Sequence, residues 1–229
     1  MNDDFIKYAI KSRGIRSSVL DDYIKEIDNY KNMTRAVIEE RPTNFREVDV
    51  FSRLIMDRII FLGTEVDDNI SNIIVAQLLF LSSTDPNEPI SLYINSPGGS
   101  IHSGLSIYDT MQYISCEVQT ICTGLAASMA AVILAGGTYK QRSALPHSRI
   151  MIHQPSGGMR GQAIEMEITV NHILGLKKDL YEILSKHTKQ SYDTIANDSE
   201  RDYWMRAEDA KKYGLIDNII TKLEQKDQK

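Results

Sequence analysis

Ser128 is the residue of this chain whose surroundings best suit nucleophilic chemistry. It stands in residues 123–130, TGLAASMA, where a β-branched pattern gives way to small residues and then to an apolar helical pattern. A serine in the first turn of a helix lies among unpaired backbone N–H groups at the positive end of the helix dipole. Negative charge that develops during acyl transfer is stabilised in such a place. A serine that only caps the helix is the commoner arrangement, and this segment alone does not separate the two.

Two glycines, Gly98 and Gly99, directly follow an expected strand over 89–95. Glycines in that position can present a backbone N–H to a substrate with no side chain in the way, which suits an oxyanion hole. A plain tight turn is an equally good reading of the pair in isolation.

His153 is the candidate general base. It ends an expected strand over 149–154 and enters the glycine-rich loop PSGG at 155–158, where clefts commonly form. Imidazole can take and return a proton near neutral pH, as a general base must. His102 and His147 carry the same group, so residue type alone does not choose among the three.

A carboxylate is needed to orient the base of a serine–histidine–aspartate triad. Asp198, Glu200 and Asp202 all lie in one polar loop. Since all three side chains are carboxylates, residue type does not show which one would orient the base.

The elements that must position these groups alternate between strands and helices. Expected strands cover 58–63, 89–95, 118–123 and 149–154, and helical patterns cover 70–82, 100–114, the segment from Ser128 to Gly136, and 161–186. Alternation of this kind predicts an α/β fold with a largely parallel sheet.

The helix expected over 161–186 has two apolar stripes. Ile164 and Ile168 form one, and the other begins with Met166 and Val170. A helix that is apolar on two sides either crosses a core or packs against another subunit as well as its own domain. The sequence pattern by itself slightly favours burial in the core.

Composition bounds the function. The chain has 229 residues, 42% of them hydrophobic, and a formal net charge of −5, which argues against binding of nucleic acid. Its two cysteines, Cys116 and Cys122, have no metal-binding or disulfide spacing, so no metal is expected. The first residues are acidic and show no apolar segment of the secretory type, and no uncharged apolar run is long enough to span a membrane, so neither a secretory signal nor a membrane span is expected. We expect a soluble, cytoplasmic protein.

Three motifs bear on the open alternatives for the serine, the glycines, the histidines and the carboxylates. They are NSPGG at 95–99, GLAASM at 124–129 and MIHQP at 151–155. Together with SIYDTMQ at 106–112 and SERD at 199–202, they closely resemble the proteolytic subunit of the Clp protease, the ClpP family. The likeness runs over 37–220, which would form the catalytic domain. The resemblance implies a ClpP/crotonase-like fold of repeated strand–strand–helix units, with 161–186 as a protruding handle helix.

The resemblance also assigns roles. It implies a serine endopeptidase that degrades unfolded proteins to short peptides inside a barrel, through an acyl-enzyme intermediate. The resemblance implies that Ser128 is the nucleophile, that His153 is the general base and that Asp202 orients His153. The oxyanion hole would be formed by Gly99 and Met129, and substrate would be bound by Gly157 and Gly158.

The same resemblance implies partners. Two heptameric rings of the chain would stack through the handle helices, and an AAA+ unfoldase of the ClpX, ClpA or ClpC type would dock on them, with Tyr93 in the docking pocket. The chain itself has no phosphate-binding motif, so we expect no cofactor and ATP use by the unfoldase alone. Residues 1–36 would be an N-terminal extension, either a propeptide or a mobile arm, and 221–229 a polar tail.

Ala130 departs from the family pattern, in which glycine is expected after Ser-Met. Its methyl group could crowd the substrate or stiffen the turn, which leaves a silent scaffolding subunit as one alternative. A crotonase-type acyl-CoA enzyme, with a backbone oxyanion hole but no serine nucleophile, is the other.

Overall fold

Parallel strand pairing dominates the central sheet, as the alternating pattern predicted. The computed structural model describes residues 37–41, 44–158 and 161–222, so the proposed N-terminal extension and most of the polar tail lie outside the described residues. The sheet runs β3-β4-β5-β6-β9, and β7 pairs with β5 on one side and antiparallel with β8 on the other. Its strands are β3 (Ile59–Leu62), β4 (Ile90–Ser96), β5 (Val118–Ala127), β6 (Arg142–Ala144), β7 (Arg149–Ile152), β8 (Tyr203–Arg206) and β9 (Asn218–Ile219).

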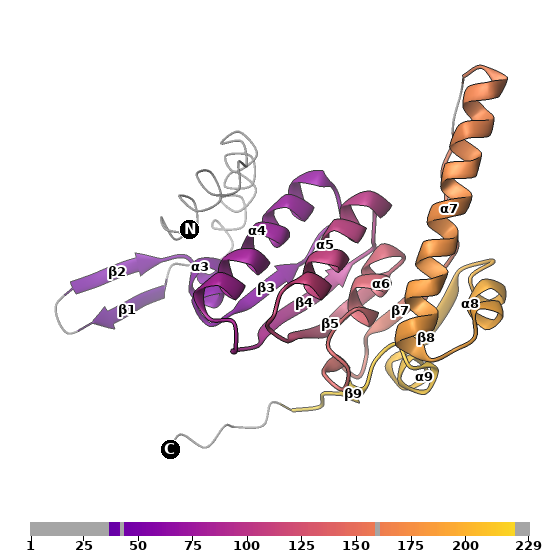
Figure 1. Ribbon diagram of the computed structural model, residues 1–229. Coiled ribbons are helices and arrows are strands. Elements are labelled where there is room, and N and C mark those ends of the chain that lie inside the picture. Colours follow the sequence, from indigo (N-terminus) through magenta and orange to yellow (C-terminus); the bar gives the residue numbers. More distant parts are fainter. Residues whose placement is uncertain (1–36, 42–43, 159–160, 223–229) are drawn as a thin grey trace.

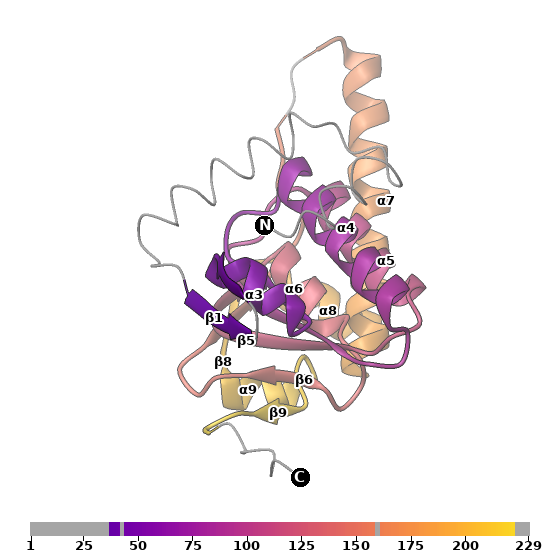
Figure 2. The same cartoon turned by 90° about the vertical axis from the view of Figure 1, so that its left-hand side faces the viewer.

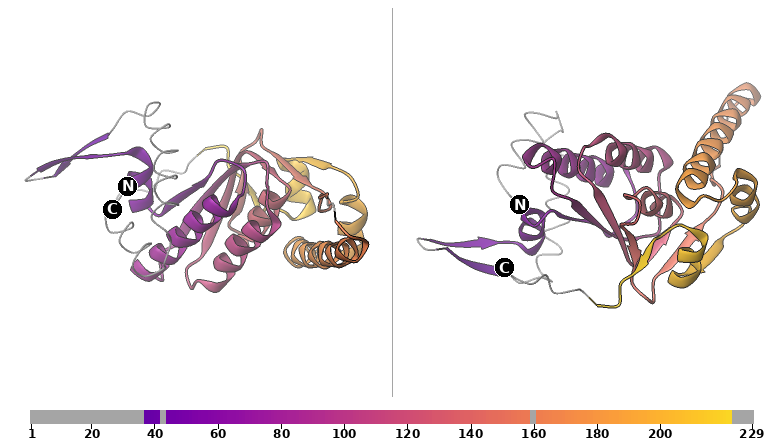
Figure 3. Two further views of the ribbon diagram at one scale, coloured as in Figure 1. Left: turned by 90° about the horizontal axis from the view of Figure 1, so that it is seen from above. Right: turned by 60° about the horizontal axis from the view of Figure 1, so that its bottom comes forward.

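A separate antiparallel hairpin, β1 (Val37–Arg41) and β2 (Asn44–Val48), extends from the body beside β3 (Figure 1). The helices α4, α5 and α6 lie side by side over one face of the sheet (Figures 1 and 3). The helices are α3 (Val50–Met56), α4 (Asp68–Thr84), α5 (Ile101–Tyr113), α6 (Met129–Ala135), α7 (Ala163–Thr188), α8 (Tyr192–Asp198) and α9 (Ala207–Tyr213).

Strand β5 is longer than the sequence pattern predicted, because it serves two partners in succession. Its first half pairs with β6 from Thr120 to Cys122, and its second half pairs with β7 from Leu125 to Ala127. The small residues after Thr123, which lie beyond the strand expected over 118–123, therefore continue the strand. They carry it directly up to Ser128.

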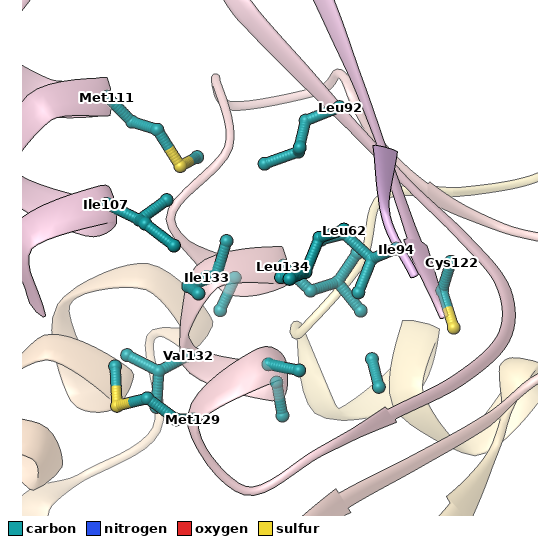
Figure 4. Packing of buried hydrophobic residues seen from close by; sticks show 14 of the residues in the cluster. Leu62, Leu92, Ile94, Ile107, Met111, Cys122, Met129, Val132, Ile133 and Leu134 are labelled. Atoms are coloured by element: carbon teal, nitrogen blue, oxygen red, sulfur yellow. The ribbon is translucent and has the colours of Figure 1, made fainter. Parts of the chain in front are cut away.

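Helix α6 is the centre of the core. Each of its seven residues is buried, which is unusual for a helix in a small domain and explains why its pattern shows no polar face. Ile133 and Leu134 of α6 lie between Ile107 of α5 and Leu62 and Ile94 of the sheet (Figure 4). The helix that starts at the nucleophile is thus held on several sides by apolar packing.

Helix α7 projects beyond the body of the protein (Figures 1 and 2). Its C-terminal part is buried through Leu180 and Leu184, whereas Ile164 and Ile168 in its N-terminal half are 60% and 64% exposed. Burial in the core, which the pattern alone favoured, is therefore wrong for this half. Two apolar stripes on a projecting helix need another surface to cover them.

Arg142 fixes the buried end of α7 to the sheet. Its guanidinium donates to the two carboxylate oxygens of Asp217 at 2.8 and 2.7 Å and to the carbonyl of His187 near the end of α7 at 3.0 Å. Arg142 is 3% exposed and Asp217 is 13% exposed, so water does little to weaken the pair. Burial raises the pKa of the Asp217 carboxyl, but the hydrogen bonds and charge of Arg142 outweigh it and hold that pKa below its ordinary value.

Replacing Asp217 with Asn is expected to lower the free energy of unfolding by about 3 kcal/mol, because the buried guanidinium of Arg142 loses its counter-charge. The stabilisation belongs to the ionised carboxylate, so it is present at neutral pH and is lost as the pH falls through the lowered pKa. The difference between the two proteins should therefore shrink below about pH 4. Denaturant unfolding at several pH values measures it. Asp57→Asn, in an exposed pair with Arg53, is the control and should cost under about 1 kcal/mol; equal effects would contradict this account.

Candidate active site

Ser128 stands at the junction of β5 and α6 in a conformation that non-glycine residues rarely adopt, with φ 56° and ψ −124°. Its side chain makes no capping hydrogen bond to the helix, so the capping interpretation is wrong. The backbone N–H of Ser128 donates to the carbonyl of Met151 at 2.9 Å, which joins this junction to β7. A strained serine between a strand and a helix presents its hydroxyl clear of the backbone, as nucleophile elbows do.

The pairing of β7 with β8 aligns the other two groups. Ile152 of β7 lies opposite Tyr203 of β8 in an antiparallel register. One step further along, the same register sets His153 opposite Asp202. Asp198 and Glu200 fall outside this alignment, so Asp202 is the carboxylate of the three that lies beside His153.

Hydrogen-bond distances show that the three side chains meet. His153 Nε2 lies 2.8 Å from Ser128 Oγ, and His153 Nδ1 lies 3.0 Å from Asp202 Oδ1. In the tautomer with its proton on Nδ1, the imidazole donates to the carboxylate and offers its Nε2 lone pair to the serine hydroxyl. This is the arrangement that a general base needs in order to activate a nucleophile.

Gly99 is held by a parallel bridge to Val66. The Val66 N–H donates to the Gly98 carbonyl at 2.8 Å and the Ser100 N–H donates to the Val66 carbonyl at 2.7 Å. Since both bonds use the neighbours of Gly99, the N–H of Gly99 points to the other side of the strand. A Cβ on Gly99 would lie 2.3 Å from the Val66 carbonyl oxygen, and φ is +148°, so only glycine fits here.

Met129 has a backbone N–H in a position that suits a second oxyanion-hole donor. It is the first residue of α6, whose N–H has no acceptor within the helix. A Cβ on Gly98 would lie 2.9 Å from the Met129 nitrogen, so the backbone at Gly98 packs directly against the start of α6. Gly98 thus lies against Ser128 and Met129, and Gly99 and Met129 line the same cleft as Ser128.

A small cleft of about 60 Å³ opens beside Ser128 and His153. Gly99 and Met129 line it, together with side chains that sequence reasoning did not assign to the site. Those from α6 and α7 are Val132, Leu180, Tyr181 and Leu184. The sequence pattern places Leu180 and Leu184 in the helix expected over 161–186 but does not link them to the site. Their i, i+4 spacing, C-terminal to the exposed apolar stripes, was the available signal that they face the body of the protein.

Gly157 and Gly158 follow His153 in an exposed segment with no regular secondary structure. A Cβ would meet nothing within 4 Å at Gly158 and only Ile173 at 3.8 Å at Gly157, so the segment has open space around it. The chain just before it is fixed, because Gln154 donates from its backbone to Ser199 at 2.7 Å. The two glycines do not line the cleft beside Ser128, whereas Pro155 and Ser156 just before them do.

The other candidates are placed elsewhere. His102 is paired with His172, and His147 is exposed at the loop before β7. Asp198 accepts a hydrogen bond from the Tyr213 hydroxyl at 2.8 Å, and burial together with this bond raises the pKa of Tyr213. Glu200 contacts Gln154 through its backbone carbonyl at 3.0 Å.

Ala130 is fully buried and belongs to the core cluster. It is not among the residues that line the cleft. Its methyl group therefore does not enter the space beside the nucleophile, and the serine–histidine contact forms with alanine in place.

Comparisons with known proteins show the family of this chain. The sequence profile of the Clp protease family matches residues 41–223. The chain belongs to the Clp protease family. It is 57% identical over 220 residues to the ATP-dependent Clp protease proteolytic subunit of Bacteroides fragilis (strain YCH46), covering 96% of this chain and 99% of the relative. The corresponding subunits of Bacteroides thetaiotaomicron and Porphyromonas gingivalis are 58% and 55% identical over 220 residues, each covering 96% of this chain and 99% and 98% of the relative.

Membership of the Clp protease family makes the chain a serine endopeptidase, and the mixed α/β sheet with its projecting α7 is the fold expected of that family. Within the described residues, no helix is long and apolar enough to cross a membrane.

Asp202→Asn is expected to lower kcat for a peptide substrate by roughly 10³- to 10⁴-fold, because an amide can stabilise the wrong imidazole tautomer and cannot balance the imidazolium charge. Initial rates with a fluorogenic peptide measure this. Glu200→Gln changes a carboxylate in the same loop that lies out of register with His153, and it should leave kcat within about twofold. A large loss in Glu200→Gln with little change in Asp202→Asn would mean that the wrong carboxylate has been assigned.

Proposed function

We propose that Ser128, His153 and Asp202 carry out peptide-bond hydrolysis in this family member. The observation that carries the proposal is the 2.8 Å contact between Ser128 Oγ and His153 Nε2. Ser128 Oγ attacks the substrate carbonyl while His153 Nε2 takes its proton. The imidazolium then gives that proton to the leaving amine, and a water molecule, activated by His153, releases the acyl group from the serine.

The N–H groups of Gly99 and Met129 would stabilise the oxyanion of each tetrahedral intermediate. An acyl-CoA enzyme of the crotonase type would use a similar pair of donors but has no use for a serine in contact with a histidine. A silent scaffold would have no reason to keep the contact either.

The proposed substrate is unfolded polypeptide, cut to short peptides. The cleft is small and lined by apolar side chains of α6 and α7, which suits an apolar residue before the scissile bond. Gly157 and Gly158 would pair with extended substrate backbone, a mode that reads the main chain and therefore accepts many sequences.

Assembly into two stacked heptameric rings is proposed on the basis of the projecting half of α7. Ile164, Ile168 and Leu174 are 60%, 64% and 54% exposed in the single chain. Such a surface is covered when α7 packs against α7 of a chain in the opposite ring. Active sites facing an enclosed chamber would be out of reach of folded proteins.

An AAA+ unfoldase of the ClpX, ClpA or ClpC type is the proposed partner. The matched relatives are named ATP-dependent, and this chain contains no phosphate-binding motif, so ATP would be used by the partner and no cofactor by this chain. Phe61, 42% exposed, stacks on Tyr93 with ring centroids 5.3 Å apart. This aromatic pair is a suitable docking point for an apolar segment of the unfoldase, and a cytoplasmic location fits such a partnership.

Ser128→Ala should reduce kcat/KM for an unstructured peptide with leucine before the scissile bond by at least about 10⁴-fold, because no acyl-enzyme can form. Gel filtration should show the same assembly as the parent. The parent should cleave the leucine peptide at least about tenfold better than a matched aspartate peptide. Near-normal cleavage by the alanine variant would refute the mechanism.

Dependence on an unfoldase has its own test. A stably folded protein should be degraded by the parent only with an unfoldase and ATP, whereas the short peptide should be cleaved without either. Degradation of the folded protein by this chain alone would contradict the proposed partnership.

Ile168→Glu should convert the double ring into single rings or smaller species, because it places a charge in the proposed contact between α7 helices. Sedimentation velocity measures the size of the assembly. Glu182→Gln, on an exposed position of the same helix beside Lys178, is the matched control and should leave the assembly intact. A double ring that persists unchanged in Ile168→Glu would remove α7 from the ring contact.

A further inference from the structure

Two histidines meet where α7 leaves the body of the protein. His102 lies in the first turn of α5 and His172 lies within α7, and their Nε2 atoms are 3.2 Å apart. The rings are nearly parallel, with an interplanar angle of 15° and centroids 5.3 Å apart. Both residues are exposed, so the pair is open to solvent. Neither histidine takes part in the peptidase site.

We propose that His102 and His172 form a binding site for a divalent transition-metal ion, with Zn²⁺ the best match. Two imidazole nitrogens bound to one tetrahedral zinc ion, each about 2.0–2.1 Å from it, are about 3.3 Å apart. The observed 3.2 Å separation meets this requirement without movement of either helix. Neutral imidazole is a favoured ligand of Zn²⁺, Cu²⁺ and Ni²⁺ and a poor one for Mg²⁺ and Ca²⁺, which prefer oxygen.

The site offers two protein ligands. Among the described residues, no third histidine, cysteine or carboxylate joins the pair into a larger cluster. Water would therefore complete the coordination, and the ion would bind reversibly and less tightly than in a structural zinc site with four protein ligands.

Without metal, the same separation suits a hydrogen bond from the Nε2–H of one ring to the Nε2 lone pair of the other. For both nitrogens to bind an ion, the donor ring moves its proton to Nδ1 through solvent. The Nε2 lone pairs of both rings are then free for the metal, and two neutral imidazoles release no net proton. The hydrogen-bonded pair thus holds the ligands in place before the ion arrives.

The ion would link the projecting helix to the body. The buried residues of α7 begin at Leu180, so His172 lies on the part of the helix that the core does not hold. His102 lies three residues after Gly99 of the proposed oxyanion hole, on a helix that packs over the sheet. Occupancy of the site would therefore restrain the N-terminal half of α7 at a point close to the active site.

The test is titration of the assembled full-length protein with Zn²⁺ against a chromophoric indicator, and with Co²⁺ followed by its visible absorption. We expect one ion per chain, and an intense absorption typical of low-coordinate cobalt. His102→Gln or His172→Gln should weaken binding by at least about tenfold, since loss of a ligand should cost no less than loss of a residue that supports one. His147→Gln, which removes an exposed histidine outside the pair, is the matched control and should leave binding unchanged.

Hydrogen exchange provides an independent readout. Zn²⁺ should slow exchange of the backbone amides over 163–176 in the parent and in His147→Gln, and it should have no such effect in His102→Gln or His172→Gln. The proposal is overturned if no ion binds. It is equally overturned if both glutamine variants of the pair bind as tightly as the parent, which would place the ion elsewhere, for example at His153.

Discussion

The register of β7 between two neighbours is the constraint on which the site depends. On one side β7 pairs with β5, and the Ser128 N–H donates to Met151; on the other side Ile152 pairs with Tyr203. The first pairing sets the distance from serine to histidine and the second sets the distance from histidine to aspartate. A slip of one residue in either pairing would turn the corresponding side chain to the opposite face of the sheet.

The backbone positions of His153 and Asp202 hold the proposed triad together more than the attraction between their charges does. The Asp202 side chain is 59% exposed and that of His153 is 25% exposed, so water screens their attraction in the single chain. A pair that is weak on its own can still hold the imidazole when the backbone on both sides is already fixed by strand hydrogen bonds. The same reasoning applies to Ser128, whose strained backbone is tolerated because the buried helix α6 begins at the next residue.

Much of this could be predicted from the sequence, and the failures have physical causes. Motif resemblance pointed to Ser128, His153 and Asp202, and the structure brings their side chains together, although their roles stay predictions. The length of β5 was missed because small residues in TGLAASM look like a turn when their strand partner, β7, is unknown. Burial of α7 was misjudged because an apolar stripe has the same pattern whether its partner is the core or another chain.

Other features depend on contacts that no local pattern contains. The bridge from Val66 to Gly99 joins segments far apart in the chain, and so does the ion pair of Arg142 with Asp217. The placement of Asp202, rather than Glu200, beside His153 depends on a strand register, which is set only when β8 folds back against β7. The meeting of His102 with His172 has the same origin, since it requires α7 to pass the start of α5.

The central claim is that this backbone arrangement activates Ser128 through His153, and fluorophosphonate labelling tests it most directly. Intact mass and peptide mapping of the purified protein would show how many adducts form and on which residue. The account predicts one adduct per chain, on Ser128, and labelling that is slowed by at least about 10³-fold in His153→Ala. Failure to label, or equal labelling of Ser128 without His153, would contradict it.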